Sequence, residues 1–158
     1  MRPKPSSAAL LAAAALVAAS TAAAAPRPAA IPGIRSPSGN IRCLFVPHRG
    51  GRAATSPSLF CSIGHATYAG ALQRRCSAPP TGLDWHGFEL TGALTGTISC
   101  SGGILYDPAT QRPAYRTLPY GEQWSRGPFV CTSRLTGVTC TTRAGHGLFV
   151  SRERWRAW

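Results

Sequence analysis

The sequence has few acidic residues and almost no lysine. Five Asp and Glu stand against seventeen Lys and Arg, which gives a formal charge of +12 at pH 7. Lys4 is the only lysine, so a glycine-rich phosphate loop, which needs a lysine behind its glycines, is excluded from the rest of the chain. Arginine in place of lysine fits either bidentate binding of phosphate and carboxylate groups or the codon bias of a GC-rich genome. Codon bias does not explain the excess of arginine over acids, and that excess favours anionic partners.

Motifs of common catalytic and metal sites are also missing. The sequence contains no Gly-x-Ser-x-Gly elbow, no Cys-x-x-Cys pair and no His-x-x-x-His pair. Their absence argues against a serine hydrolase with a nucleophile elbow and against a zinc site. The six cysteines are an even number, which argues against an unpaired thiol as a nucleophile. We therefore expect no metal, no cofactor and no enzymatic activity.

Long apolar runs are confined to the N-terminus. Arg2 and Lys4 precede the alanine-rich stretch Ala8–Ala19, and an Ala-x-Ala cleavage motif follows at Ala22–Ala24. This order is typical of a secretory signal peptide, which we assign to residues 1–24. A membrane anchor is the alternative, but a spanning helix needs about 20 strongly apolar residues and alanine is only weakly apolar. We expect a secreted protein, extracellular or associated with the cell envelope, with no membrane span after cleavage.

The remaining chain has the length of one domain. Residues 25–35 are rich in Pro and Ala and are expected to form a disordered leader, followed by a single domain over residues 36–158. Short apolar or β-branched runs are separated by turn signals, and no helical period exceeds about two turns. The pattern predicts an all-β fold, mainly antiparallel, with at most one or two short helices. The expected strands are Ile41–Val46, Leu59–Ile63, Leu83–Leu90, Thr95–Ser101, Phe129–Ser133, Val138–Thr142 and Leu148–Ser151, with a short helix within His65–Arg75, a helical turn at Arg152–Trp158 and a mobile basic loop at His48–Ser58.

Six cysteines in an exported chain predict a small domain held together by disulfides. They allow 15 pairings, and the sequence alone does not select one. We expect sequential pairing, which joins Cys43 to Cys61, Cys76 to Cys100 and Cys131 to Cys140. The last pair has the strongest basis, because the Thr-rich sequence around Gly137 is typical of a hairpin with its two cysteines opposite each other. Each bridge is worth roughly 2.5–3.5 kcal/mol for loops of these lengths.

Two histidines have neighbours that would suit acid–base chemistry. His146 lies between Gly145 and Gly147, so its ring could be an exposed acid–base group or anion contact. Asp84 and His86 would share one face of a strand, as a general base pair or as a surface ion pair. We favour a structural explanation for both, namely a turn at a strand entry and an exposed ion pair, and assign no catalytic residue.

The C-terminal segment alternates arginine with tryptophan. If Arg152–Trp158 were helical, Trp155 and Trp158 would share a stripe, and Arg152 and Arg156 would lie one turn apart. Such a set can bind polyanions or lie at a membrane surface. The alternative is that both tryptophans close the core while the arginines are solvated. The residues that we predict as ligand contacts are His146, Arg152, Trp155, Arg156 and Trp158.

Four segments of the chain have a recognisable order. They are Ser36–Cys43 (SPSGNIRC), Leu118–Glu122 (LPYGE), Cys131–Cys140 (CTSRLTGVTC) and Gly145–Arg152 (GHGLFVSR). In this order they resemble a family of small secreted, cysteine-containing actinobacterial proteins of unknown function. The resemblance spans about Ile34 to Trp158 and implies export and a cysteine-stapled domain. Because the family has no established activity, the resemblance assigns no catalytic or binding residue.

These observations predict a secreted, non-enzymatic binding domain that is monomeric and contacts an anionic envelope polymer or an acidic protein through Arg and Trp residues. Nucleic acid is not expected as a partner outside the cell. Two alternatives stay open. One is a secreted hydrolase that uses His146 with a carboxylate. The other is a proteinase inhibitor that presents the loop His48–Ser58.

Overall fold

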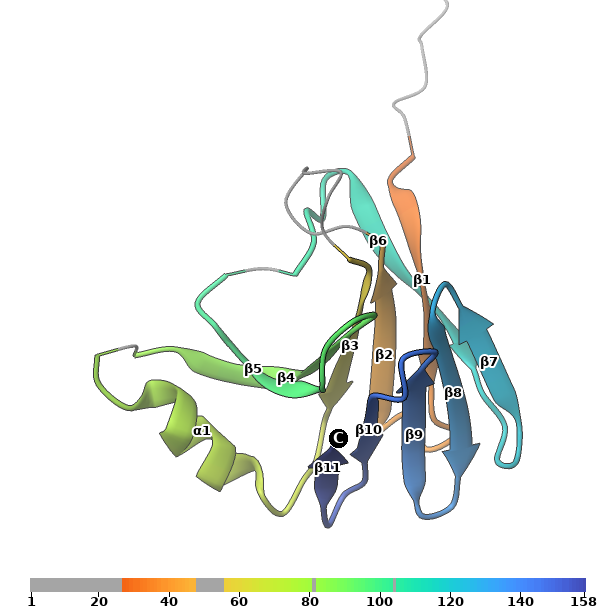
Figure 1. Cartoon of the computed structure of the whole chain (residues 1–158). Helices are drawn as coiled ribbons and strands as arrows, with labels where there is room; N and C mark the ends of the chain where they lie inside the picture. The colour runs from red at the N-terminus through yellow and green to blue at the C-terminus, as the bar shows by residue number, and fades with distance from the viewer. Residues whose placement is uncertain (1–26, 48–55, 81, 104) are drawn as a thin grey trace, which may run out of the picture.

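The computed structural model describes residues 27–47, 56–80, 82–103 and 105–158. The expected signal peptide over residues 1–24 and most of the expected basic loop, residues 48–55, lie outside the described residues. The described chain forms two β-sheets and one short helix, α1 (Ala69–Ser77), which lies beside one end of the larger sheet (Figure 1). The sequence predicted a short helix within His65–Arg75. The observed helix overlaps this segment and extends beyond it to Ser77.

The strands are paired almost entirely antiparallel. The larger sheet has the order β5 (Thr97–Ser101), β4 (Asp84–Thr91), β3 (Ser58–Ile63), β2 (Ile41–Val46), β1 (Ala29–Arg35) and β6 (Gln111–Thr117). The smaller sheet has the order β11 (Trp155–Ala157), β10 (Gly147–Val150), β9 (Gly137–Thr142), β8 (Phe129–Arg134) and β7 (Gln123–Arg126). Of the pairs in these sheets, β1 with β6 is parallel. The all-β, mainly antiparallel fold class expected from the sequence is confirmed.

The main core lies between the two sheets. Alternate residues of each strand point into it, as Ile41 and Cys43 do from β2 and Phe129 and Cys131 do from β8. Burying a large apolar side chain completely contributes about 1.5–3 kcal/mol, so these inward rows hold the layers together. The wholly or almost wholly buried large side chains of this core are Ile34, Leu59, Phe88, Leu90, Leu118, Phe129, Leu148 and Val150.

All three disulfides join the cysteines in the sequential order that the spacing favoured. Cys43 lies directly opposite Cys61 on β2 and β3, with their Cα atoms 4.0 Å apart. Cys131 lies opposite Cys140 across the β8–β9 hairpin at the same Cα separation of 4.0 Å. The remaining bridge, Cys76–Cys100, ties α1 to β5.

The leader expected over residues 25–35 is wrong for most of its length. Ala29–Arg35 forms β1, an interior strand between β2 and β6, and the ordered domain therefore begins before Ser36. Ile34 of this strand is 1% exposed in the core. The Pro- and Ala-rich composition concealed the strand, because its order comes from pairing with the next strand, β2, on one side and with the distant strand β6 on the other, and not from local propensity.

The helical turn expected over Arg152–Trp158 is also wrong. The hydroxyl of Ser151 accepts hydrogen bonds from the backbone N–H groups of Glu153 (3.2 Å) and Arg154 (3.1 Å), which makes a tight turn and not a helix. The chain then returns as β11, antiparallel to β10. In this conformation Trp155 reaches the core, where its ring centroid is 5.0 Å from that of Phe88. Burial of the indole against Phe88 favours the strand over an isolated helical turn.

Candidate functional site

A groove of about 890 Å³ opens at one end of the two sheets. Its walls are turns and strand ends from both sheets. They are the β1–β2 turn with the start of β2, the end of β3, the β8–β9 turn, the β10–β11 turn and Tyr120. The lining residues are Ser36, Ser38–Arg42, Ser62–His65, Tyr120, Arg134–Gly137 and Ser151–Glu153.

Side-chain hydrogen bonds to backbone groups hold the β1–β2 wall of the groove in place. Ser36, which is 5% exposed, accepts a hydrogen bond on its Oγ from the N–H of Ile41 at 3.1 Å. The Asn40 side chain pairs with the backbone of His65 twice: its Oδ1 accepts from the N–H at 2.8 Å and its Nδ2 donates to the carbonyl at 3.1 Å. Gly39 completes the turn at a φ of +72°, a conformation that favours glycine. These contacts fix the turn before any ligand arrives.

The β10–β11 wall is anchored to the segment before α1. The hydroxyl of Tyr68 donates a hydrogen bond to the carbonyl of Ser151 at 2.9 Å, and the N–H of Thr67 donates to the carbonyl of Arg152 at 2.9 Å. Burial, and to a smaller extent the charge of Glu153, raises the pKa of Tyr68 to about 12. The raised pKa extends into the alkaline range the conditions under which the Tyr68 hydroxyl donates to Ser151 and keeps the Ser151–Glu153 turn in place.

The turn that carries Tyr120 is fastened to the β8–β9 hairpin. The N–H of Gly121 donates to the carbonyl of Ser133 at 2.7 Å, and the N–H of Ser133 donates to the carbonyl of Glu122 at 3.1 Å. Leu118, at the start of the turn, is completely buried in the core. Tyr120 is thereby presented at the groove on a backbone fixed by two hydrogen bonds and one apolar anchor.

The groove carries more positive than negative charge. Arg42, Arg134 and Arg152 line it from three different turns or strands, and all three are exposed. Glu153 is the one acidic side chain among the described lining residues. Within the part of the chain that the structure describes, none of these three guanidinium groups forms an ion pair with a carboxylate. Their hydrogen-bonding capacity is therefore available to a ligand.

Two apolar side chains lie at the same rim. Leu135, at the tip of the β8–β9 hairpin, is 85% exposed, and Tyr120 is 44% exposed. Exposed leucine beside arginine and tyrosine gives the rim both charge and contact area, and arginine and tyrosine are enriched in binding surfaces. The groove can thus hold an anion by charge and pack against the body of the same ligand.

The four segments that carry the family resemblance all reach this groove. Ser36–Cys43 supplies Arg42, Leu118–Glu122 supplies Tyr120, the Cys131–Cys140 hairpin supplies Arg134 and Leu135, and Gly145–Arg152 ends in Arg152. Arg42 and Arg152 are 110 residues apart in the sequence, and the four segments belong to both sheets. The fold thus brings them together at one end.

The five ligand contacts expected from the sequence do not form one site. Arg152 lies in the groove. Trp155 packs in the core against Phe88. His146, Arg156 and Trp158 lie at the other end of the β10–β11 pair, where the backbone of Gly147 hydrogen-bonds that of Trp158.

Arg156 and Trp158 contact each other. The guanidinium of Arg156 lies 4.8 Å from the centroid of the Trp158 ring. The ring covers Gly147 so closely that a Cβ on that glycine would lie 2.2 Å from Trp158 Cζ2. Arg156 belongs to β11 and Trp158 directly follows that strand, so no stripe of a helix is involved.

No described carboxylate is a partner of His146. Its Nδ1 lies 3.4 Å from the hydroxyl of Thr95, in the β4–β5 connection. Hydrolysis by His146 with an acid, the alternative raised from the sequence, would need a carboxylate within hydrogen-bond reach. The arrangement around His146 gives that alternative no support.

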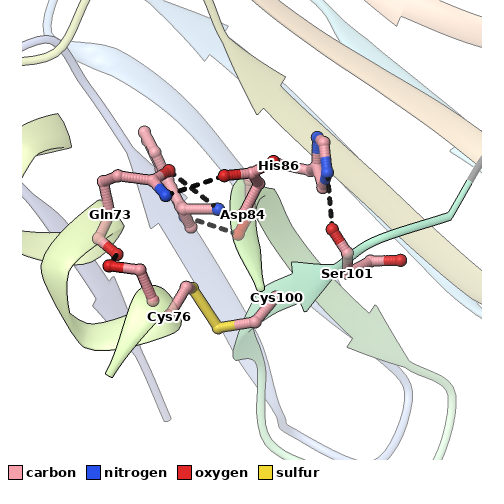
Figure 2. Close-up of a disulfide and its surroundings, with 9 residues drawn as sticks. Gln73, Cys76, Asp84, His86, Cys100 and Ser101 are labelled. Atoms are coloured by element: carbon pink, nitrogen blue, oxygen red, sulfur yellow. Dashed lines mark hydrogen bonds between the residues drawn. A yellow bond between two sulfur atoms is a disulfide. The ribbon is translucent and has the colours of Figure 1, made fainter. Parts of the chain in front are cut away.

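Asp84 and His86 do not form the pair expected of neighbours two residues apart. The register of β4 against β5 shifts between Trp85 and Gly87, so the two side chains are separated by a bulge. Asp84 accepts a hydrogen bond from Gln73 of α1 at 2.9 Å, whereas His86 Nε2 hydrogen-bonds the carbonyl of Ser101 at 2.8 Å (Figure 2). Both the general-base and the ion-pair interpretations of Asp84 and His86 are therefore wrong.

Arg42, Arg134, Tyr120 and Leu135 were not among the contacts expected from the sequence. Each lies in a segment that carried the family resemblance, but nothing in the local sequence indicates that these segments meet. Their common position at turns and strand ends was a usable signal, because binding residues concentrate there. The strand order of the sheets cannot be derived from the sequence, so the sequence did not show that these turns lie close together.

One cluster of potential metal ligands is present in the described chain. The sulfur atoms of Cys43, Cys61 and Cys140 all lie within 4.8 Å of one another. Each of them is in a disulfide, whereas a metal ligand must be a thiolate. The cluster is the contact of two bridges and offers no ligand in this oxidised form. None of the described helices is long and apolar enough to cross a membrane.

Comparison with known proteins identifies a family without a known activity. A family of unknown function, DUF6636, matches residues 9–157, which is almost the whole chain. No curated protein and no solved structure matched in the corresponding comparisons. Since the match includes both sheets and all residues that line the groove, the chain belongs to the DUF6636 family.

Proposed function

We propose that this protein is an exported, non-enzymatic binding domain that holds an anionic polymer in the groove between the ends of its two sheets. The observation that carries the proposal is the meeting of Arg42, Arg134 and Arg152 around one groove with a single acidic residue, Glu153. Clefts lined by one sign of charge concentrate oppositely charged ligands. Three internal disulfides and the N-terminal sequence support export.

The binding mechanism combines charge with a preformed wall. Guanidinium groups form bidentate hydrogen bonds with phosphate or carboxylate oxygens, and three of them along a groove suit a ligand with repeated anionic groups. The turns next to Arg42 and Arg152 are held by Ser36, Asn40 and Tyr68, so little backbone freedom is lost there on binding. Tyr120 and Leu135 at the rim would contact the uncharged parts of the ligand.

The test compares two sets of arginine substitutions with equal loss of charge. The groove variant carries Arg42→Gln, Arg134→Gln and Arg152→Gln. The control variant carries Arg74→Gln, Arg75→Gln and Arg112→Gln, which are exposed on α1 and β6 and do not line the groove. Affinity for polyphosphate and for poly-L-glutamate is measured by titration calorimetry at about 0.05 M and about 0.5 M salt.

We expect the groove variant to lose at least about tenfold in affinity for one of the two polymers, and the control variant to lose only about two- to threefold. Glu153→Gln should strengthen binding, because it removes the one acidic side chain of the lining. Equal losses in both triple variants would show that charge alone, without the groove, attracts the polymer. Binding that does not change with salt would also overturn the proposal.

A further inference from the structure

A second hollow lies on the outer face of the larger sheet, away from the core between the sheets. It has a volume of about 430 Å³, in the range of small-molecule pockets. Its floor is formed by side chains of β2, β3, β4, β5 and β6, and the β5–β6 connection closes one side. The lining residues are Leu44, Phe60, Ser62, His86, Ser99, Ser101, Gly103, Leu105, Tyr106, Pro108 and Tyr115.

The floor of this hollow is apolar although it faces outward. Tyr115, Gly33, Leu44 and Phe60 are register partners in one row across β6, β1, β2 and β3. Leu44 is 3% exposed and Phe60 is 9% exposed, yet neither belongs to the core between the sheets. Gly33 has no side chain, and Leu44 and Tyr115 approach over it, since a Cβ there would lie 2.9 Å and 3.0 Å from their side chains. A solvated sheet face would normally carry polar residues at these positions.

His86 brings one oriented polar group to the apolar floor. The bulge between Trp85 and Gly87 turns His86 toward β5, where its Nε2 lies 2.8 Å from the carbonyl oxygen of Ser101 (Figure 2). A carbonyl oxygen only accepts hydrogen bonds, so Nε2 must carry the proton. In the neutral ring Nδ1 is then an acceptor, and it points away from Ser101. No residue in the described part of the chain hydrogen-bonds this nitrogen.

We propose that this hollow is a binding site for a compact, mainly apolar ring compound that donates one hydrogen bond to His86 Nδ1. The volume fits such a molecule, and the apolar floor of Leu44, Phe60 and Tyr115 matches its rings. One fixed acceptor beside an apolar surface selects ligands by orientation, which is the usual composition of a small-molecule site. The hollow shares Ser62 with the arginine groove, and the Arg42 guanidinium of that groove lies 5.9 Å from the centroid of the Tyr115 ring, but the ligand proposed for the hollow does not depend on the function proposed for the groove.

The experiment uses two probes of similar shape, in one of which a methyl group replaces the hydroxyl hydrogen. 2-Naphthol has a hydroxyl donor, whereas 2-methoxynaphthalene has none. Binding of each to the oxidised protein is followed by probe fluorescence. Backbone amide shifts in a ¹⁵N-labelled sample report where the probe binds. We expect 2-naphthol to bind roughly three- to tenfold more tightly and to shift the amides of Leu44, Phe60 and Ser99.

Two variants with the same chemical change separate the site from general effects. His86→Phe keeps an aromatic ring but removes the acceptor, so it should abolish the preference for 2-naphthol. His146→Phe, at a histidine outside the hollow, should leave the preference unchanged. The proposal is overturned if the two probes bind the wild-type protein equally, if neither binds up to its solubility limit, or if the shifted amides lie elsewhere. A preference that survives in folded His86→Phe protein would exclude the role given to His86.

Discussion

The sulfur atoms of Cys43 and Cys140 lie within 4.8 Å of each other, although the two residues belong to different sheets. The bridges Cys43–Cys61 and Cys131–Cys140 therefore contact each other in the centre of the core, where the exposure of all four cysteines is at most 1%. Each bridge fixes a pair of neighbouring strands, and their contact is part of the packing between the layers. The third bridge, Cys76–Cys100, fixes a helix at the side.

Removing a core bridge should cost more than removing the bridge to the helix. The double variant Cys43→Ala and Cys61→Ala loses about 3 kcal/mol of loop entropy and also leaves space in the packed core. The double variant Cys76→Ala and Cys100→Ala loses a similar entropy term but disturbs mainly α1. We expect thermal unfolding midpoints lower by at least roughly 10 °C for the first and by less for the second. Equal midpoints for both variants would contradict the role given to the sulfur contact.

Gly87→Ala should strongly destabilise the fold. Gly87 has a φ of +137°, and a Cβ there would lie 2.2 Å from the backbone oxygen of Cys61. Because neither backbone can move without breaking the β3–β4 pairing, we expect a loss of about 2–4 kcal/mol in urea unfolding. Gly103→Ala is the control, since its nearest neighbour would be the Ser101 hydroxyl at 3.7 Å, and its cost should stay within about 0.5 kcal/mol. A tolerated Gly87→Ala would contradict the bulge that places His86.

Asn40→Ala should loosen the wall of the arginine groove. The substitution removes both hydrogen bonds between the Asn40 side chain and the His65 backbone, with an expected cost of about 1–2 kcal/mol. Asn40→Asp keeps the acceptor and loses the donor, so its stability should fall between the two. Amide hydrogen exchange at His65 should be faster in Asn40→Ala than in the wild-type protein. Unchanged exchange at His65 would show that another contact holds this wall.

Tyr68→Phe should reveal the raised pKa of Tyr68 through the pH dependence of stability. At pH 8 the variant lacks the bond to the Ser151 carbonyl and should be less stable by about 0.5–1.5 kcal/mol. The folded state holds the proton of Tyr68 more tightly than the unfolded state, because its pKa rises from 10.0 to about 12. This stabilisation is complete below pH 10 and is lost as the pH rises towards 12.

The difference in unfolding free energy between wild-type protein and Tyr68→Phe should therefore shrink across that pH range. Tyr115, whose pKa burial also raises, is present in both proteins and its contribution cancels in the comparison. Urea unfolding of both proteins at several pH values between 9 and 11 measures the change. A difference that stays constant over this range would mean that Tyr68 is no harder to ionise in the folded protein than in the unfolded one.

Features that depend on short stretches could be predicted from the sequence. The β8–β9 hairpin and its disulfide follow from a Thr-rich pattern around Gly137 with cysteines placed opposite each other. Strands such as β2 and β3 follow from apolar runs bounded by turns. By contrast, β1, β6 and β7 have weak local signals. β1 and β6 pair with each other although they lie far apart in the sequence, and β7 pairs with the adjacent strand β8. The C-terminal segment fits both a helical turn and a strand locally, and the position of Trp155 beside Phe88 favours the strand.

The sequence by itself determined the fold class and the excess of arginine, and it indicated the Cys131–Cys140 pair, because these depend on composition and on short-range spacing; the structure fixed the other two bridges. Only the tertiary structure decided which arginines meet. Arg42, Arg134 and Arg152 come from turns and strands of two sheets, and their proximity depends on how those sheets pack. The same packing separates His146 and Trp158 from Arg152 and turns Trp155 into the core. Long-range packing is not encoded in any local pattern, so the groove could be found only once the sheets were in place.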